Sequence, residues 1–217
     1  MTTKALYDAV TAYFQEHLPD ARSELHFENA FQLLVAVMLS AQCTDKRVNL
    51  ITPALFEALP TPERMASSSP EEILTYVSSC SYPNSKSMHL WQMACKLTEK
   101  FHGIVPQTVE DLMQLPGVGR KTANVMMAVM FGQPAMPVDT HVFRVSHRLG
   151  LVKDASTPEE TERQLTSHLP RSCWSLAHHW LLLHGRYVCK ARRPECEKCG
   201  LASVCQFCHE QKCAKLS

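Results

Sequence analysis

Residues 111–123 read Asp-Leu-Met-Gln-Leu-Pro-Gly-Val-Gly-Arg-Lys-Thr-Ala, and this stretch is the most informative part of the chain for the fold. We expect one short helix to end at Leu115, a tight turn to follow, and a second helix to begin near Gly119. Two glycines flank the single apolar residue Val118, so the backbone can turn sharply and lie close to a partner. The pattern predicts a helix-hairpin-helix unit with Val118 packed into the core.

The start of the second helix predicts a site for an anion. Amides in the first turn of a helix have no partner within it, and the helix dipole is positive there. We therefore expect the amides of residues 118–121 to point outward and to bind DNA phosphates without reading sequence. An ordinary corner between two helices is the alternative. The predicted DNA contacts here are Gly117, Val118, Gly119 and Arg120.

Lys121 lies in the first turn of that second helix. The positive end of the helix dipole opposes its charge and favours the free amine. A free amine beside DNA is a nucleophile that can attack a sugar carbon and form a Schiff base. On the residues alone, a further phosphate contact beside Arg120 is an equally good interpretation.

A second informative stretch, residues 137–141, reads Pro-Val-Asp-Thr-His. Asp139 is placed to cap a helix whose residues Val142 and Val145 face inward, and capping is the usual role of an aspartate in this position. A capping carboxylate can also stabilise the cationic sugar that forms as a base departs, by analogy with the paired carboxylates of glycosidases. Both interpretations stay open at this point.

Six of the ten cysteines crowd into residues 189–213. A zinc ribbon separates its two cysteine pairs by roughly 15–20 residues, so the short gaps here favour a [4Fe–4S] cluster. A four-thiolate zinc site with Cys208 in place of Cys189 is the alternative, and the spacing does not decide whether Cys208 or Cys213 ever binds metal. The predicted cluster ligands, in a 6-2-5 spacing, are Cys189, Cys196, Cys199 and Cys205.

The charge of the chain is balanced, with 22 basic and 21 acidic side chains and a formal net charge of +1. Any surface for nucleic acid must therefore be local. The loop inside the first cysteine gap carries Lys190, Arg192 and Arg193, and we expect these side chains to contact DNA phosphates. The alternative for so short a basic run is a solvated face.

Helical spacing of apolar residues and the lack of strand alternation predict an all-α fold of roughly ten helices. The 217 residues fit one large domain or two compact lobes. The longest apolar stretch, residues 30–41, is too short to span a bilayer and predicts a buried helix. With no recognisable targeting segment, these features predict a soluble cytoplasmic protein, nucleoid-associated in a bacterium, with no membrane partner.

Three motifs in order together resemble the endonuclease III family: residues 115–124, residues 138–145 and the 6-2-5 cysteine spacing. The resemblance runs over nearly the whole chain. It implies a helix-hairpin-helix DNA glycosylase fold, with a six-helix barrel domain at residues 21–132, an iron–sulfur cluster domain at residues 1–20 and 133–217, and a cleft between them for DNA. The implied partner is damaged double-stranded DNA, and a monomer is the expected state.

The resemblance also implies roles for single residues. Lys121 matches the nucleophile of the family and Asp139 its essential carboxylate. Gln42 matches the residue that fills the gap left by an extruded nucleotide, and Tyr82 occupies the place of an apolar wedge. The implied reaction removes oxidised pyrimidines through a lysine Schiff base and then cleaves the strand by β-elimination.

Two alternatives to that function remain. One is a glycosylase of the same fold that acts on another lesion, such as a pyrimidine dimer or a mismatch. The other is a non-catalytic DNA-binding module held together by metal. The chain also departs from the family pattern, because Tyr82-Pro83 replaces an aliphatic–aromatic pair and Cys43 stands beside Gln42 where a small residue is common. Both departures bear on which lesion or opposing base is accepted.

Overall fold

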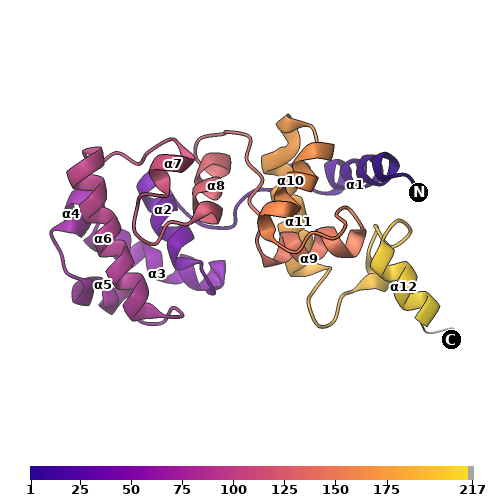
Figure 1. The fold of residues 1–217 in the computed structure, drawn as a ribbon. Coiled ribbons are helices and arrows are strands. Elements are labelled where there is room, and N and C mark those ends of the chain that lie inside the picture. Colours follow the sequence, from indigo (N-terminus) through magenta and orange to yellow (C-terminus); the bar gives the residue numbers. More distant parts are fainter. Residues whose placement is uncertain (215–217) are drawn as a thin grey trace. The chain divides into compact units, whose positions relative to one another are not determined.

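The computed structural model describes the backbone of residues 1–214 and the side chains of residues 1–211. Throughout these residues the chain is α-helical and contains no β-strand, which confirms the predicted class. Ten of the α-helices in the described part of the chain are eight residues or longer, as the sequence indicated. The helices form two compact units, Glu24–Gln133 and a second one that joins Met1–Ser23 to the chain from Pro134 onward (Figure 1).

The unit Glu24–Gln133 is built on a buried central helix. All residues from Phe31 to Leu39 are buried, which confirms the buried helix expected at residues 30–41. Each fully buried leucine there contributes roughly 1.5–3 kcal/mol to stability. None of the helices in the described residues is long and apolar enough to cross a membrane. The helices of this unit are α2 (Ala30–Leu39), α3 (Asp45–Ala58), α4 (Pro62–Ala66), α5 (Pro70–Val77), α6 (Pro83–Phe101), α7 (Val109–Leu112) and α8 (Arg120–Val129).

The helix-hairpin-helix lies at the end of this unit, where α7 and α8 pack against each other and α8 packs against α2 (Figure 1). The second helix begins where expected, with Gly119 as its N-cap. The first helix ends at Leu112 rather than at Leu115. The reason is that the amides of Gln114 and Leu115 bond to carbonyls three residues back, which tightens the chain into turns. Val118 is buried, as predicted.

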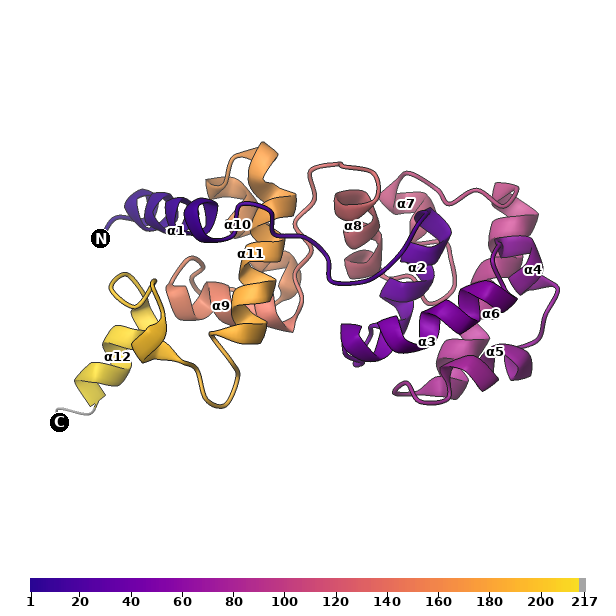
Figure 2. The same ribbon diagram turned by 180° about the vertical axis from the view of Figure 1, so that it is seen from behind.

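The second unit joins the N-terminal helix to the C-terminal part of the chain (Figure 2). The Tyr7 hydroxyl donates a hydrogen bond to the Leu151 carbonyl at 2.9 Å, and the Trp180 indole N–H donates one to the Leu18 carbonyl at 2.8 Å. Phe14 stacks on Trp180 in the core of the same unit. The helices of this unit are α1 (Thr3–His17), α9 (Thr140–Leu149), α10 (Pro158–His168), α11 (Trp174–Tyr187) and α12 (Gln206–Ala214), with two short 3₁₀ turns, η1 (Arg171–Cys173) and η2 (Cys196–Lys198).

The units divide after Ser23 and after Gln133, whereas the sequence predicted domain limits after residues 20 and 132. The first division comes later because Leu18 and Ala21, which follow α1, still pack against the apolar core of the N- and C-terminal unit.

Candidate functional site

The two glycines of the hairpin differ in whether the fold requires glycine there. Gly117 has a φ of +77°, and a Cβ added there would lie 2.9 Å from the Cβ of His89, so the turn and its packing both require glycine. Gly119 has an ordinary φ of −93°, and a Cβ there would meet nothing within 4 Å. The bare backbone at Gly119 therefore serves no packing within its own unit, and it leaves open space at the start of α8.

The amides at this helix start are not all directed outward. The Val118 N–H donates to the Leu115 carbonyl at 3.1 Å, which corrects the expectation that it points toward an anion: it closes the turn of the hairpin instead. Gly119 offers no side chain to cap the helix. The amides of Gly119 and Lys121 bond to no residue that the structure describes, and such groups call for water or a ligand as partner.

Lys121 is the second residue of α8 and is exposed. Among the described residues, its side chain has no hydrogen-bond or ion-pair partner. The structure thus places a primary amine within one turn of the uncapped amides, on the same accessible helix end.

Gln42 and Tyr82 lie at the tips of two neighbouring loops in the unit Glu24–Gln133. Their φ angles are 53° and 54°, a left-handed conformation that bulky residues adopt only at a cost. The Ser81 hydroxyl donates to the Gln42 carbonyl at 2.7 Å, which ties the two loops together. Tyr82 is the N-cap of α6, directly before Pro83, and it remains 66% exposed.

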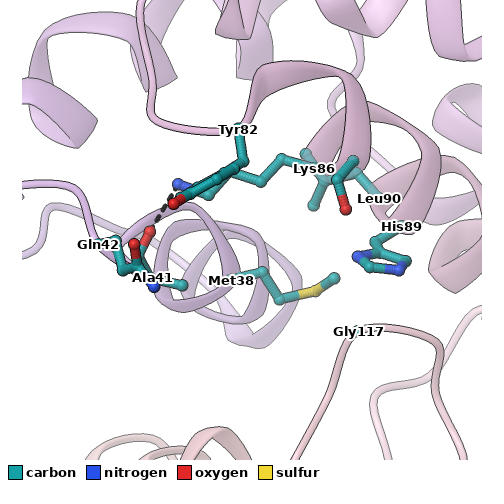
Figure 3. Close-up of a pocket in the computed structure, with 9 residues that line it drawn as sticks. Met38, Ala41, Gln42, Tyr82, Lys86, His89, Leu90 and Gly117 are labelled. Atoms are coloured by element: carbon teal, nitrogen blue, oxygen red, sulfur yellow. Dashed lines mark hydrogen bonds between the residues drawn. The ribbon is translucent and has the colours of Figure 1, made fainter.

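These two loops and the hairpin line one cavity of about 220 Å³. Gln42, Tyr82 and Gly117, three of the predicted DNA contacts, all belong to its wall. Figure 3 shows Lys86 extending from α6 to the loop at Ala41, and His89 and Met38 facing each other beside Gly117. The structure therefore brings together residues that lie up to 79 positions apart in the sequence (38 to 117).

Lys86 holds the loop that carries Gln42 through hydrogen bonds to its backbone. Its buried amine donates to the carbonyls of Leu39 and Ala41, both at 2.8 Å. Leu39 is the last residue of α2 and Ala41 lies two residues beyond it. The last turn of a helix leaves carbonyl acceptors without partners. Lys86 therefore holds the loop that carries Gln42 against α6. Its buried lysine amine was not foreseen from the sequence, because lysine is ordinarily exposed.

Asp139 caps α9, as predicted. Its Oδ1 accepts hydrogen bonds from the amides of His141 at 2.9 Å and Val142 at 2.8 Å. Both bonds use the same carboxylate oxygen, and no described residue donates a hydrogen bond to Oδ2. The carboxylate can therefore cap the helix with one oxygen and still present the other, so capping does not exclude a chemical role.

Five cysteines of the C-terminal part line a single apolar cavity. Burial raises the pKa of the Cys205 thiol to about 11, and it is also the largest cause of the raised pKa of the Cys199 thiol. No three His, Cys, Asp or Glu side chains in the described part of the chain are arranged to hold a metal ion. The five cysteines are Cys189, Cys196, Cys199, Cys205 and Cys208, and Cys213 lies outside the residues whose side chains are described.

The comparisons with known proteins agree on one family. The HhH-GPD superfamily of base excision DNA repair proteins matches residues 35–171. The chain is 44% identical over 194 residues to endonuclease III of Rickettsia conorii (strain ATCC VR-613 / Malish 7), which covers 89% of this chain and 92% of that protein. It is 40% identical over 193 residues to endonuclease III of Escherichia coli (strain K12), covering 89% of this chain and 91% of that protein.

A solved structure of a trapped endonuclease III–DNA covalent intermediate has a TM-score of 0.93 to this chain at 40% identity, covering 98% of this chain and 100% of the other. The chain belongs to the endonuclease III family. It is accordingly a DNA glycosylase and AP lyase of base excision repair. The comparison also confirms the predicted fold class, an all-α helix-hairpin-helix DNA glycosylase fold with a six-helix barrel.

Two arginines of α9, Arg144 and Arg148, contact Cys189, one of the predicted cluster ligands. Arg148 approaches the Cys189 sulfur at 3.4 Å and donates to the carbonyls of Lys190 at 2.8 Å and Ala191 at 2.9 Å. Arg144 donates to the Cys189 carbonyl at 3.2 Å. The two arginines stand four residues apart on one helix face, which is the signal that sequence reasoning could have used.

A histidine also contacts the same cavity. The His184 ring nitrogen Nε2 lies 3.6 Å from the Cys199 sulfur. Burial lowers the pKa of His184 to about 4, so the ring is neutral near pH 7 and adds no positive charge beside the thiols.

The basic loop expected to contact DNA is partly neutralised within the chain. The Lys190 amine forms an ion pair with Glu195 at 2.6 Å. Arg192 and Arg193 are exposed and have no ion-pair partner among the described residues. Of the three basic residues predicted for DNA, the two arginines therefore keep their full charge toward solvent.

Proposed function

We propose that this member of the endonuclease III family removes oxidised pyrimidines from double-stranded DNA and cleaves the strand at the emptied site, with Lys121 as nucleophile. The start of α8 is the observation that carries the proposal. It combines the uncapped amides of Gly119 and Lys121 with an exposed primary amine within one helical turn. A phosphate bound at these amides would place the adjoining sugar at the same helix end as the amine.

The proposed reaction starts with the uncharged amine of Lys121. Its nitrogen forms a bond to the sugar C1′, and the bond from C1′ to the base breaks with its electron pair on the base. Loss of the amine proton and opening of the sugar ring give a Schiff base. The Schiff base acidifies the C2′ proton, and removal of that proton expels the 3′ phosphate by β-elimination.

Asp139 has a separate proposed role. Positive charge develops on the sugar as the base leaves, and a carboxylate stabilises such a charge. Because Oδ1 is held by the two amides of α9, the orientation of the carboxylate is fixed before any substrate binds. A preorganised charge of this kind requires no rearrangement at the moment of reaction.

DNA binding in this proposal uses groups that do not read sequence. The amides of Gly119 and Lys121, together with Arg120, hold one stretch of phosphates, and Arg192 and Arg193 hold another. Gln42 and Tyr82 support the stack that the extruded nucleotide leaves, as side chains inserted into a helix do. The complex is expected to contain one copy of the chain on one duplex.

The chemistry of the cysteine cavity, rather than the present spacing of its thiols, suits a [4Fe–4S] cluster, the cofactor of the endonuclease III family. Five thiols line the cavity, most of its other lining residues are apolar, and Arg148 supplies positive charge beside the Cys189 sulfur. The proposed ligands are Cys189, Cys196, Cys199 and Cys205. When bound, the cluster ties the end of α11 to η2 and to the start of α12, and it supports the basic loop between its first two ligands.

Paired cysteine variants test the ligand set without relying on activity. We expect Cys189→Ser to lose iron and sulfide, whereas Cys208→Ser keeps the iron, the sulfide and the brown colour of the native protein. A four-thiolate zinc site would give the reverse result: zinc in the purified chain, no sulfide, and loss of metal in Cys208→Ser.

Borohydride trapping tests the reaction itself. The native chain is incubated with duplexes that contain thymine glycol, a cyclobutane pyrimidine dimer, a mismatch or an abasic site, and borohydride is added to reduce any Schiff base. We expect a covalent adduct on thymine glycol and on the abasic site, with the DNA remnant on the peptide that contains Lys121. An adduct formed on the dimer but not on thymine glycol would transfer the assignment to a dimer glycosylase. DNA binding without any adduct would leave a non-catalytic binding module.

A further inference from the structure

A second pair of cysteines lies away from the cysteine cavity and takes no part in the proposed reaction. Cys43 stands in the loop between α2 and α3, and Cys80 stands in the loop between α5 and α6. Their sulfur atoms are 3.7 Å apart. Cys80 is buried and Cys43 is only half-buried, so a small reagent in solution reaches the pair at Cys43.

The distance suits a bond that can form without refolding. Bonded sulfurs lie 2.03–2.05 Å apart, so these two must approach by roughly 1.7 Å, which side-chain rotation and a small loop movement supply. Cys95 gives a contrast within the same unit. Its sulfur contacts the Ala66 carbonyl at 3.9 Å, and no second thiol lies against it among the described residues.

The surroundings favour an ordered reaction between the two thiols. Burial, helped by the contact with Cys43, raises the pKa of the Cys80 thiol to about 11, while Lys86 and Arg47 act in the opposite direction. Cys80 therefore stays protonated near neutral pH. Attack on an oxidant falls to Cys43, the more exposed sulfur, and Cys80 is in place to attack second.

We propose that Cys43 and Cys80 form a reversible disulfide that weakens the binding of DNA. The oxidant class is a small-molecule disulfide such as glutathione disulfide. The Cys43 thiolate attacks one sulfur of the oxidant, the S–S bond of the oxidant breaks, and the first glutathione leaves as a thiol after gaining a proton. The Cys80 sulfur, losing its proton, then attacks the Cys43 sulfur and expels the second glutathione. The two cysteines lose two electrons and the oxidant gains them.

The link would join the two loops that carry Gln42 and Tyr82, and this consequence depends on the proposed function of these residues. The loops are already coupled by the hydrogen bond from Ser81 to the Gln42 carbonyl. They also form one wall of the same cavity. A covalent link at Cys43, directly beside Gln42, holds the loops at a fixed separation and opposes the adjustment that insertion into DNA requires.

The first part of the experiment detects the bond. The reduced chain and the chain treated with glutathione disulfide are digested, and the peptides are analysed by mass spectrometry. We expect a peptide pair joined through Cys43 and Cys80 that disappears on treatment with dithiothreitol. Cys95→Ala is the matched control and should form the same pair, whereas Cys43→Ala should not. Absence of the joined pair from the native chain would overturn the proposal.

The second part measures affinity for a duplex with a stable abasic-site analogue. We expect the oxidised native chain to bind about tenfold more weakly, the scale of one lost stacking contact, and to recover with dithiothreitol. Cys43→Ala should bind equally well under both conditions. A joined pair with unchanged affinity would overturn the proposed effect on DNA. The reduced native chain is measured first, and its failure to bind would count against the proposed function and not against the disulfide.

Discussion

The starts of α8 and α9 solve the same physical problem in opposite ways. At α9, the Oδ1 atom of Asp139 accepts hydrogen bonds from two backbone amides, so the chain itself satisfies the helix end. At α8, the N-cap is Gly119, which has no side chain to cap the helix, and the amides of Gly119 and Lys121 bond to none of the residues that the structure describes. Unpaired amides of this kind are costly unless water or a ligand binds them.

The difference shows how far geometry alone assigns a function. The open end of α8 has no structural explanation within its unit, since Gly119 has room for a side chain and lacks one. At α9, capping through Oδ1 accounts for an aspartate at position 139, so the geometry alone does not assign Asp139 a chemical role. Two kinds of substitution therefore decide what each helix start does. At α9, a substitution must remove the charge of Asp139 and keep the cap, and at α8 it must remove the amine of Lys121 and keep the backbone amides.

Removal of the Lys121 amine should reduce the rates of base release and strand cleavage more than any other substitution considered. We expect Lys121→Ala to lose strand cleavage and base release by roughly 10⁴-fold or more, the scale on which loss of a covalent nucleophile acts. Affinity for DNA with an abasic-site analogue should fall much less, because the amides of α8 remain. Single-turnover cleavage and equilibrium binding measure the two quantities separately.

Lys153→Ala is the control for this substitution, since Lys153 is an exposed lysine of the other unit. It should behave as the native chain in both assays. Equal losses of binding and cleavage in Lys121→Ala would mean that Lys121 is a phosphate contact, the alternative that the sequence left open.

The second prediction separates the two possible roles of Asp139. Asp139→Asn keeps an oxygen that accepts from His141 and Val142 but removes the charge, so stability should be nearly unchanged. Base release should fall by about 10²- to 10³-fold, the effect of removing one electrostatic stabiliser. Asp139→Ala should show the same loss of rate and should also lose about 1 kcal/mol of stability with the cap. An active Asp139→Asn would reduce this residue to a helix cap.

The parts of the fold and of the candidate site that the sequence predicted are those that depend on local residue types. The hairpin turn, the α8 start and the cap of α9 depend on local residue types, such as Gly117 at a positive φ, and local rules find them. The end of α7 was misplaced by three residues, because turns of the i to i−3 type have no distinctive residue pattern. The outward amide of Val118 was wrong for the same reason, since the Leu115 carbonyl takes it up in such a turn.

Contacts between distant segments were beyond reach of sequence patterns. Lys86 lies under a loop more than 40 residues earlier in the chain, with its amine on the Ala41 carbonyl. The 3.7 Å approach of Cys43 to Cys80 likewise joins two loops that three helices, α3, α4 and α5, separate in the sequence. Each cysteine alone reads as an ordinary reduced, buried residue, and only the fold makes them a pair.

The hairpin glycines provide the third prediction, in which stability and DNA affinity move apart. Gly117→Ala should lose about 1–3 kcal/mol of stability, because alanine at a φ of +77° is strained and its Cβ meets His89. Gly119→Ala should change stability by no more than about 0.5 kcal/mol, since a less flexible unfolded chain and a poorer N-cap offset each other. Its added methyl group should instead weaken DNA binding.

Thermal unfolding and binding to an abasic-site duplex measure these two effects. Comparison at a temperature where both variants are folded removes the stability difference from the binding result. Unchanged affinity in Gly119→Ala would mean that no phosphate approaches this part of the backbone, and the open end of α8 would then need water as its partner.

The smallest effect is expected at a third helix start, α10, where a carboxylate has a structural role and no proposed chemical one. Glu160 accepts hydrogen bonds from the Ser156 amide, the Ser156 hydroxyl and the Thr157 amide, and the bond from the Ser156 amide is the main reason that the pKa of Glu160 is lowered. A lowered pKa in the folded state stabilises the fold above the ordinary pKa of glutamate, and this stabilisation is lost as the pH falls through the lowered value. Melting temperatures of the native chain and of Glu160→Gln should therefore differ slightly at neutral pH and converge in acid.

Base release by Glu160→Gln should equal that of the native chain, in contrast to Asp139→Asn. A loss of activity in both variants would mean that any change at a helix start impairs the enzyme, and the distinction between the capped and the open helix ends would lose its functional meaning.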